Sequence, residues 1–219
     1  KLFSHLEKID NSPKGETKKS VFLTSYTPDF SKNYPLPPKR SLRYYLSGMT
    51  TKEAESLMQS KALYSIQTRL NKATLMRDYR ELIVGLQQLA TSYNGFIWDS
   101  ETRQCFSPNS WKKQRIDSWD YPKVPSPYLA KHFHIHAYRM DDSKPGCRAI
   151  TLGLGKFGLP DLSVEGFLWS ESTSIQNLLN ITAQQLQQQD NLKNPAKFDI
   201  NIQSIKNPVF QRSIEGFTE

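Results

Sequence analysis

Apolar side chains recur at steps of three and four over residues 71–93, which is the period of a helix with one buried face. Asn71 can cap the start of this helix, and Asn94-Gly95 can end it in the left-handed conformation. The same period predicts a last helix to about residue 188, with Thr173 and Gln176 expected to cap its start. The segments around these helices are shorter. Some alternate between apolar and polar residues and others are continuously apolar, so we expect strands between the helices.

Two shorter helices are predicted by their start signals. Thr50 and Glu53 have the spacing of a capping box, in which each side chain accepts a hydrogen bond from a backbone N–H of the other. Ser107-Pro108 is typical of a helix start, because proline at the first helical position has no N–H to leave unpaired. We therefore expect one helix after Thr50 and a short one over residues 109–115.

Strands are predicted where short segments alternate between apolar and polar residues. The strongest is residues 132–140. The others are residues 21–26, 42–46, 62–68, 95–99, 104–106, 147–154, 164–168 and 198–205. Because strands adjoin one another between the helices, we expect an α+β fold in which two or three helices pack on a mixed or antiparallel sheet. An irregular basic N-terminal arm, residues 1–45, is expected ahead of a single domain over residues 46–219.

Charge and hydropathy narrow the classes of partner. The 219 residues carry a formal net charge of +8, with a mean hydropathy of −0.62 and no apolar run long enough to predict a spanning helix. The cations are concentrated in residues 1–45, net +5, and 111–148, net +4, whereas residues 149–219 are net −2. They are not interleaved with aromatic side chains as on a nucleic-acid-binding surface, so no nucleic-acid partner is expected.

Three histidines form the sharpest local feature. His132, His134 and His136 alternate along the strongest predicted strand, so all three would point to one face. Imidazoles arranged in this way can bind zinc or iron when a further ligand lies nearby. The candidate further ligands are Asp141, Asp142 and Glu165. None has a diagnostic spacing, so we favour a polar sheet face over a metal site and assign no metal.

A glycine motif follows a predicted strand. Gly153, Gly155 and Gly158 match the G-x-G-x-x-G fingerprint of dinucleotide-binding proteins, which requires a helix to begin there and hold the pyrophosphate. Leu159-Pro160 predicts a turn instead, so no nucleotide cofactor is expected. The glycines are expected to permit a bulge or a close approach of backbone.

The two cysteines are further candidates for a catalytic group. Cys105 could in principle form a nucleophile pair with a histidine, but no glycine-rich elbow or helix start flanks it. A small buried side chain is the favoured interpretation, and a disulfide with Cys147 is the alternative in an oxidising compartment. Because no catalytic set is complete, we assign no catalytic residue and no cofactor, and we do not predict an enzyme.

Exposed aromatic and basic side chains are the best candidates for an interface. A proline-rich loop after residue 118 carries aromatic residues, which loops seldom bury without a partner. The basic N-terminal arm supplies arginines. The candidate interface residues are Trp119, Tyr121, Tyr128, Arg40 and Arg43.

Residues 148–164, R-A-I-T-L-G-L-G-K-F-G-L-P-D-L-S-V, resemble a signature of uncharacterised bacterial domains of unknown function. In those domains T-[VL]-G-[ML] is followed by F-G-[LH]-P-[ED]-L before a final helix. The resemblance covers about residues 48–190 and implies an α+β fold, but it transfers no catalytic residue because the family has none assigned. The basic, Lys-, Asn-, Gln- and Ser-rich composition is similar, more weakly, to accessory subunits of Dot/Icm-type type IV secretion outer-membrane complexes.

These features favour a non-enzymatic structural or interaction subunit of a larger bacterial assembly, such as the core complex of a secretion system in the cell envelope. Its partners would be other protein subunits. The chain would lie in the periplasm or at the outer membrane, and any association with a membrane would be through those partners. Two alternatives stay open. One is a metal-dependent enzyme or metal-binding protein that uses His132, His134 and His136, and the other is a cytoplasmic immunity-type module that binds a partner.

Overall fold

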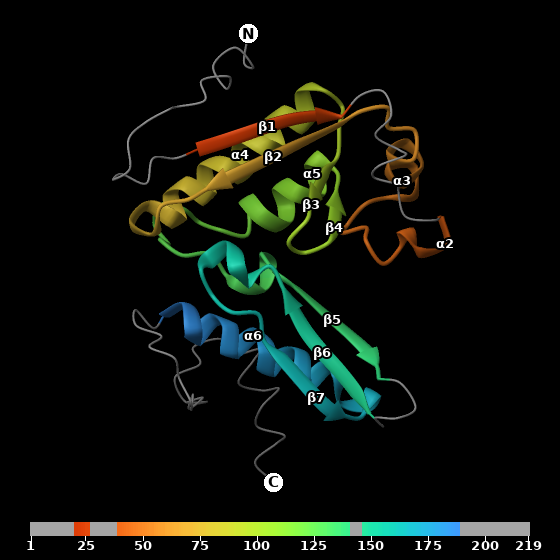
Figure 1. Ribbon diagram of the computed structural model, residues 1–219, viewed down its shortest axis with the longest axis vertical. Helices are drawn as coiled ribbons and strands as arrows, with labels where there is room; N and C mark the ends of the chain where they lie inside the picture. Colours follow the sequence, from red (N-terminus) through yellow and green to blue (C-terminus); the bar gives the residue numbers. More distant parts are fainter. Residues whose placement is uncertain (1–19, 27–38, 141–145, 189–219) are drawn as a thin grey trace. The chain divides into compact units, whose positions relative to one another are not determined.

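The computed structural model describes the backbone of residues 20–26, 39–140 and 146–188, and the side chains of residues 41–140 and 146–188 (Figure 1). Helices and antiparallel sheets alternate along these ranges, which confirms the predicted α+β class. The predicted strand at residues 198–205 lies outside them. None of the helices within the described ranges combines the length and the apolar character that a membrane span requires.

Contacts divide the chain into two compact units. The first contains the described residues up to Trp98 together with Gln104–Ser126, and the second contains Asp99–Arg103 and the described residues from Pro127. This division differs from the single domain expected over residues 46–219. Residues 39–45, which the sequence assigns to the N-terminal arm, belong to the first unit.

The first unit combines a strand pair with most of the helices. β1 (Ser20–Tyr26) and β2 (Leu63–Arg69) pair antiparallel over their whole length, which confirms two predicted strands. The remaining elements are α2 (Lys39–Leu42), α3 (Thr51–Leu57), η2 (Lys72–Thr74), α4 (Leu75–Ser92), α5 (Pro108–Trp111) and η3 (Lys112–Ile116), with the short hairpin of β3 (Ile97–Asp99) and β4 (Gln104–Phe106). Asp99, at the end of β3, belongs to the second unit.

Three of the predicted start signals are formed. The Thr50 N–H donates to Glu53 Oε2 at 2.7 Å and the Glu53 N–H donates to Thr50 Oγ1 at 3.3 Å, which is the expected capping box of α3. Asn71 caps the 3₁₀ turn η2, from which α4 continues. The Ser107 hydroxyl accepts from the Ser110 N–H at 3.3 Å and so caps α5. Local hydrogen bonding therefore sets these three helix starts.

Glu53 also links two helix starts. A hydrogen bond from the buried Ser107 hydroxyl, followed in size by the bond from the Thr50 N–H, holds the pKa of the Glu53 carboxyl below its usual value. The carboxylate of α3 thus contacts the residue that caps α5.

The strand predicted at residues 42–46 is wrong. The chain forms α2 up to Leu42, and a following turn is closed by the Tyr45 N–H, which donates to the Leu42 carbonyl at 2.9 Å. Only Leu46 pairs, as a single parallel bridge with Cys105. Local turn hydrogen bonds satisfy the backbone that the alternating pattern assigned to a sheet.

The core of the first unit is aromatic. α4 packs against α5 and η3, and the Trp111 indole N–H donates to the Ile83 carbonyl at 2.8 Å. Phe106 meets Trp111 edge-on, with 5.1 Å between ring centroids. A second cluster joins Leu57 and Cys105 with other buried apolar residues. These contacts bury one face of α4 and leave the other face exposed.

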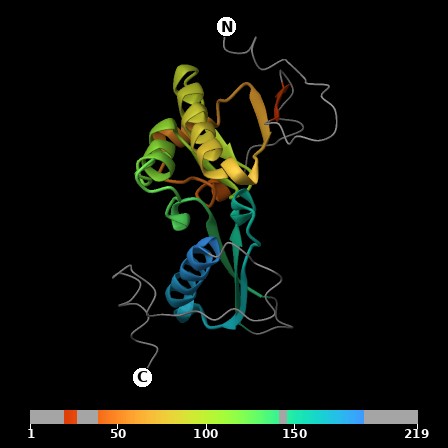
Figure 2. The ribbon, with the colours of Figure 1, turned by 90° about the vertical axis from the view of Figure 1, so that its left-hand side faces the viewer.

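The second unit is a three-stranded sheet covered by one helix. β5 (His134–Arg139), β6 (Cys147–Leu152) and β7 (Ser163–Phe167) pair antiparallel in the order β5-β6-β7. The short helices are η4 (Leu129–Lys131), η5 (Leu154–Phe157) and η6 (Trp169–Glu171). The long helix α6 (Ser172–Gln188) lies along one side of the sheet (Figure 2). It begins one residue before Thr173, so this expected capping residue lies inside the helix.

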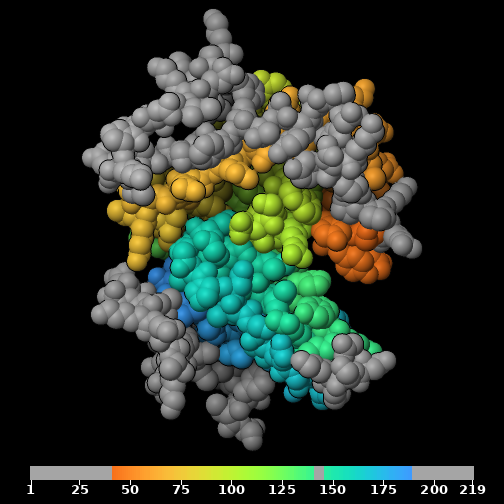
Figure 3. Space-filling model, viewed as in Figure 1, coloured from red at the N-terminus to blue at the C-terminus, as the bar shows by residue number. Residues whose placement is uncertain are grey.

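Side chains alternate between the two faces of this sheet. Ala149 and Phe167 pack with Leu179 of α6, and Ile135 and Ala137 join the same cluster. The residues between them in sequence therefore lie on the opposite face. Figure 3 shows that face of the unit, with the green and teal strands in front of the blue helix. It is the face on which β5 carries His134 and His136.

Candidate interaction surface

Trp119, the first interface candidate, is buried and not on the surface. Its side chain is 3% exposed, and its indole N–H donates to the Val124 carbonyl at 2.7 Å. The Tyr121 ring meets it edge-on at 5.4 Å, and Tyr79 of α4 lies at 6.5 Å. The prediction for Trp119 is wrong because the proline-rich loop folds back and supplies the partners that the indole requires.

The other candidates differ in accessibility. Tyr121 and Tyr128 are half-buried, and burial raises the pKa of the Tyr128 hydroxyl. Arg43 is exposed and follows α2 directly. Arg40 lies within α2, and its side chain is outside the described side chains. Of the five candidates, Arg43 is thus the side chain that the structure places clearly on the surface.

Arg43 belongs to an exposed aromatic segment of the first unit. Its guanidinium lies 4.8 Å from the Tyr44 ring centroid, and its Nη2 donates to the Tyr44 hydroxyl at 2.7 Å. The adjacent Tyr45 ring lies 6.0 Å from the Trp98 ring. Tyr44 is 65% exposed and Trp98 is 45% exposed. We call Arg43, Tyr44, Tyr45 and Trp98 the aromatic segment.

Backbone hydrogen bonds hold the aromatic segment in place. The Cys105 N–H donates to the Tyr45 carbonyl at 2.7 Å, and the Ser47 N–H donates to the Cys105 carbonyl at 2.9 Å. Cys105 lies in β4, so the turn that carries the tyrosines is attached to the hairpin that carries Trp98. The exposed rings are consequently presented by an ordered backbone.

Sequence reasoning selected Arg43 but missed the three aromatic members of this segment. The consecutive Arg43-Tyr44-Tyr45 would have drawn attention to the turn. Trp98 could have been recognised from strand alternation, because Ile97 is buried and its neighbour must face the other way. No sequence pattern, however, shows that Trp98 lies against Tyr45.

The histidine row is shorter than predicted. His132 is fully buried and meets Phe157 edge-on at 6.1 Å. It follows the 3₁₀ turn η4, where its N–H donates to the Leu129 carbonyl at 2.7 Å. Strand alternation begins only at His134, so the prediction of three histidines on one face is wrong for His132.

The remaining row consists of His134, His136 and Tyr138 on the open face of the sheet. The two imidazole centroids are 6.4 Å apart, and His136 lies 5.4 Å from the Tyr138 ring. On the same face, Glu165 pairs with Arg148 at 3.1 Å. Within the described ranges, no group of three or more His, Cys, Asp or Glu side chains could hold a metal ion.

The glycine motif forms a closed turn in the second unit. Gly153 has a φ of +101°, and a Cβ there would lie 2.9 Å from Thr102 Cγ2. Lys156 Nζ donates to Asp99 Oδ2 at 2.7 Å, with both side chains largely buried. The Thr102 side chain thus packs directly against the Gly153 backbone, whereas Gly155 and Gly158 have no comparably close contact. Only the four-residue η5 follows Gly153, in place of the long helix of a dinucleotide site.

Asp161 closes the other end of the motif. Its Oδ1 accepts from the Thr151 hydroxyl at 3.0 Å and from the Leu154 N–H at 3.2 Å. The Thr151 hydroxyl in turn accepts from the Leu162 N–H at 2.7 Å. The polar residues of the motif thus bond to the chain itself.

Both cysteines are buried free thiols. Burial raises the pKa of Cys105 to about 12, against a smaller lowering effect of the Phe106 N–H. A nucleophilic cysteine has a lowered pKa and an accessible thiolate, so Cys105 has the opposite properties.

Comparisons with protein-family models, with curated proteins and with solved structures found no match to this chain.

Proposed function

We propose that the chain is a non-enzymatic interaction subunit of a larger bacterial assembly, which it joins through the aromatic segment of its first unit. The supporting observation is the exposure of Arg43 and Tyr44 on an ordered turn and of Trp98 on the adjoining strand β3. These three residue types are enriched at the energetic centres of protein interfaces, where they bury large area at low entropic cost. The partner is therefore another protein subunit with a complementary apolar surface.

The assembly is proposed to be a cell-envelope complex, such as the core complex of a secretion system. The support for this finer proposal is the composition of the chain, with its net charge of +8. The position of the aromatic segment does not depend on where the assembly lies in the cell. The interaction can therefore be tested without assuming a compartment.

Co-purification of the tagged full-length chain from its native cells tests the proposal. We expect a stable complex of defined stoichiometry with the natural chain. The double variant Tyr44→Ala/Trp98→Ala should lose it, because removing two exposed rings at an interface centre weakens binding at least about a hundredfold.

The matched control is Tyr64→Ala/Tyr93→Ala, which removes two aromatic side chains of the same unit that are exposed to 54% and 66%. This control should keep the complex. The proposal is overturned if both double variants behave alike, or if the natural chain runs as a monomer in the native extract.

A metal-binding function is the second candidate, and the adjacent imidazoles of His134 and His136 support it. Elemental analysis of the purified protein decides between the two. Stoichiometric zinc or iron that is lost in His134→Ala/His136→Ala would favour the metal-binding protein. A metal content that is unchanged in this variant would leave the interaction subunit as the better account.

A further inference from the structure

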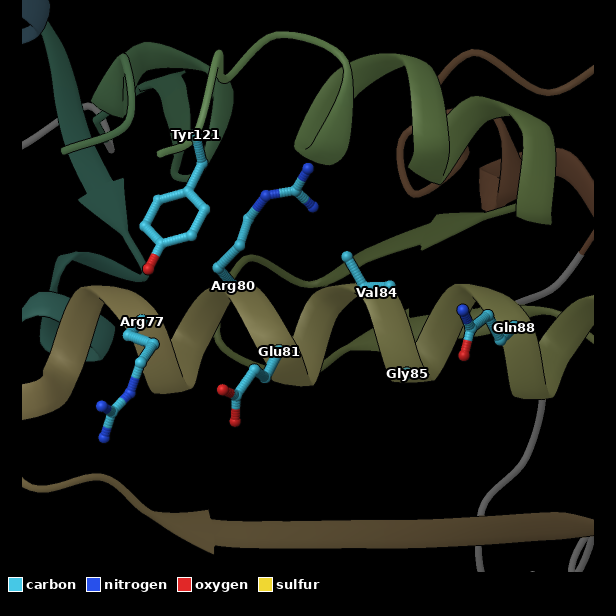
Figure 4. A pocket seen from close by; sticks show the side chains of 7 residues that line it. All are labelled: Arg77, Arg80, Glu81, Val84, Gly85, Gln88 and Tyr121. Atoms are coloured by element: carbon cyan, nitrogen blue, oxygen red, sulfur yellow. The ribbon is translucent and has the colours of Figure 1, made fainter. Parts of the chain in front are cut away.

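The outward face of α4 carries a pocket of about 410 Å³ (Figure 4). This volume lies in the range that accepts a small organic molecule. Figure 4 shows α4 across the middle of the view, with Tyr121 and Arg80 on one side of the helix and Arg77 and Glu81 on the other. The residues that line the pocket are Arg77, Arg80, Glu81, Val84, Gly85, Gln88 and Tyr121.

Gly85 is unusual for its position. It lies in the interior of an 18-residue helix, where glycine is less stable than alanine. A Cβ at Gly85 would meet nothing within 4 Å, so neither close packing nor a left-handed backbone requires glycine. Because glycine has no side chain, the surface of α4 that forms the floor of the pocket stays open at this position. The fold does not need this opening.

Arg80 supplies a cation in the pocket wall. Its guanidinium lies 5.9 Å from the Trp119 ring centroid, within cation–π distance. Its Nε and Nη1 are buried without a hydrogen-bond partner. Buried donors of a charged group are costly when they lack an acceptor. Arg80 lines the pocket on the same side of α4 as Tyr121, so an anion beside Tyr121 would lie next to this charge (Figure 4).

The pocket has three further polar lining groups besides Arg80 and Glu81. Arg77 is 56% exposed at its side chain and makes one long contact, 3.4 Å, with Asp78. Tyr121 adds a phenolic hydroxyl, and Gln88 adds an amide at the far end of the lining. Glu81 is the one carboxylate in the lining, and Figure 4 shows it with Arg77 on the opposite side of α4 from Arg80 and Tyr121.

We propose that this pocket binds a small anionic molecule that carries a carboxylate or phosphate group on a compact apolar body. Arginine binds both groups through paired N–H donors, which explains the charge of the wall. Val84, the Tyr121 ring and the open floor at Gly85 would contact the apolar body. The site is separate from the aromatic segment, so the inference stands independently of the proposed interaction.

Binding is measured by NMR titration of the full chain, following the amide signals of α4 and the indole N–H signals. The probes are phenyl phosphate and benzoate, which share an aromatic body and differ in the anionic group, and uncharged benzyl alcohol. We expect saturable shifts at α4 and at the Trp119 indole with at least one anion, in the millimolar range. The stronger of the two anions identifies the group that the pocket prefers.

Arg80→Gln should weaken binding of that anion at least about tenfold, because a charge-assisted hydrogen bond is lost. Lys52→Gln, at an exposed cation of α3 outside the lining, should leave it unchanged. Gly85→Leu should abolish binding by filling the floor. Gly85→Ala should raise Tm by about 2–4 °C, which shows that substitution there does not damage the fold.

The proposal is overturned if neither anion gives saturable shifts, or if benzyl alcohol binds as tightly as the anions. It is also overturned if Gly85→Leu is folded and binds like the natural chain. Loss of binding in Gly85→Leu, with a raised Tm in Gly85→Ala, supports it even if Arg80→Gln does not fold.

Discussion

Arg115 is among the largest fully buried side chains of the described residues, at 2% exposure. Its guanidinium lies 4.9 Å from the Phe106 ring centroid and 5.7 Å from that of Trp111, and its Nη2 donates to Gln104 Oε1 at 3.3 Å. Arginine is rarely buried unless such groups surround it. An arginine next to a predicted short helix would be expected at the surface, so its burial depends on the rings that the fold brings together.

Cys105 should be unreactive in the folded protein. Its pKa of about 12 means that iodoacetamide at pH 8 finds almost no thiolate, whereas the unfolded chain should react rapidly. The measurement is mass spectrometry of Cys147→Ala, in which Cys105 is the remaining cysteine. Rapid native labelling would contradict the burial of this thiol.

The same shift makes stability depend on pH. The unfolded thiol loses its proton near its ordinary pKa of 9.0, while the folded thiol keeps it up to about 12. The folded state therefore binds more protons between these values, and the free energy of unfolding should fall as pH rises through this window. The free energy of unfolding is measured by urea titration at pH 8 and at pH 10. It should fall less between these two pH values in Cys105→Ala than in the natural chain.

The Asp99–Lys156 pair should stabilise the second unit. Besides Lys156 Nζ, Asp99 Oδ1 accepts from the Glu101 and Thr102 N–H groups, and the two charged side chains are only 7% and 14% exposed. Asp99→Ala should cost about 3–5 kcal/mol, because it removes the carboxylate that contacts a largely buried ammonium group and accepts from two backbone N–H groups. Lys156→Met should cost less, since the carboxylate keeps its two N–H donors.

The matched control for this pair lies on the surface. Lys112 Nζ contacts Asp117 at 2.8 Å, but both side chains are about half exposed. Lys112→Met should change the free energy of unfolding by less than about 1 kcal/mol. An equal loss in the free energy of unfolding in Lys156→Met and Lys112→Met would show that the buried pair stabilises the protein no more than the exposed pair.

At the scale of elements, periodicity predicted well wherever one face of an element is buried. In α4, Tyr79, Ile83 and Ala90 are buried as the period requires. Tyr93, the last position of the predicted stripe, is instead 66% exposed, because it follows the last helical residue and its backbone has left the helical conformation. Helix ends are thus where the apolar period stops being informative.

The glycine motif allows a test within one short element. Gly153→Ala should lower the free energy of unfolding by about 3 kcal/mol, because a left-handed φ and a 2.9 Å approach to Thr102 both oppose a Cβ. Gly155→Ala should stay within about 0.5 kcal/mol, since its nearest contact is 3.8 Å away. Chemical denaturation of both variants measures the difference, and equal effects would refute the close approach.

At the scale of the whole molecule, the net charge of +8 does not identify a partner. The structure adds exposed aromatic side chains at the aromatic segment and a separate, arginine-lined pocket on α4. Both features belong to the first unit.

Cell fractionation tests the proposed envelope assembly. We expect the native protein in the envelope fraction, in a complex much larger than its 25.3 kDa chain. Extraction with salt should distinguish electrostatic attachment from a stable complex, because screening weakens only the former. Recovery as a cytoplasmic protein with a single small partner would favour the immunity-type module instead.

The sequence by itself determined the α+β class, most strands and the helix starts at Thr50, Asn71 and Ser107. These depend on periodicity and on hydrogen bonds between residues close in the chain, which the order of residues contains directly. Only the tertiary structure decided that Trp119 and His132 are buried and that the chain forms two compact units.

Both proposed sites were likewise decided only by the tertiary structure. The contact of Tyr45 with Trp98, and the approach of Tyr121 to Arg80 and Gly85, join residues more than thirty positions apart. Composition and local spacing contain no information on such contacts, because they form only when several elements bury their apolar faces together. Candidate residues could therefore be named from the sequence, but their accessibility was decided by packing.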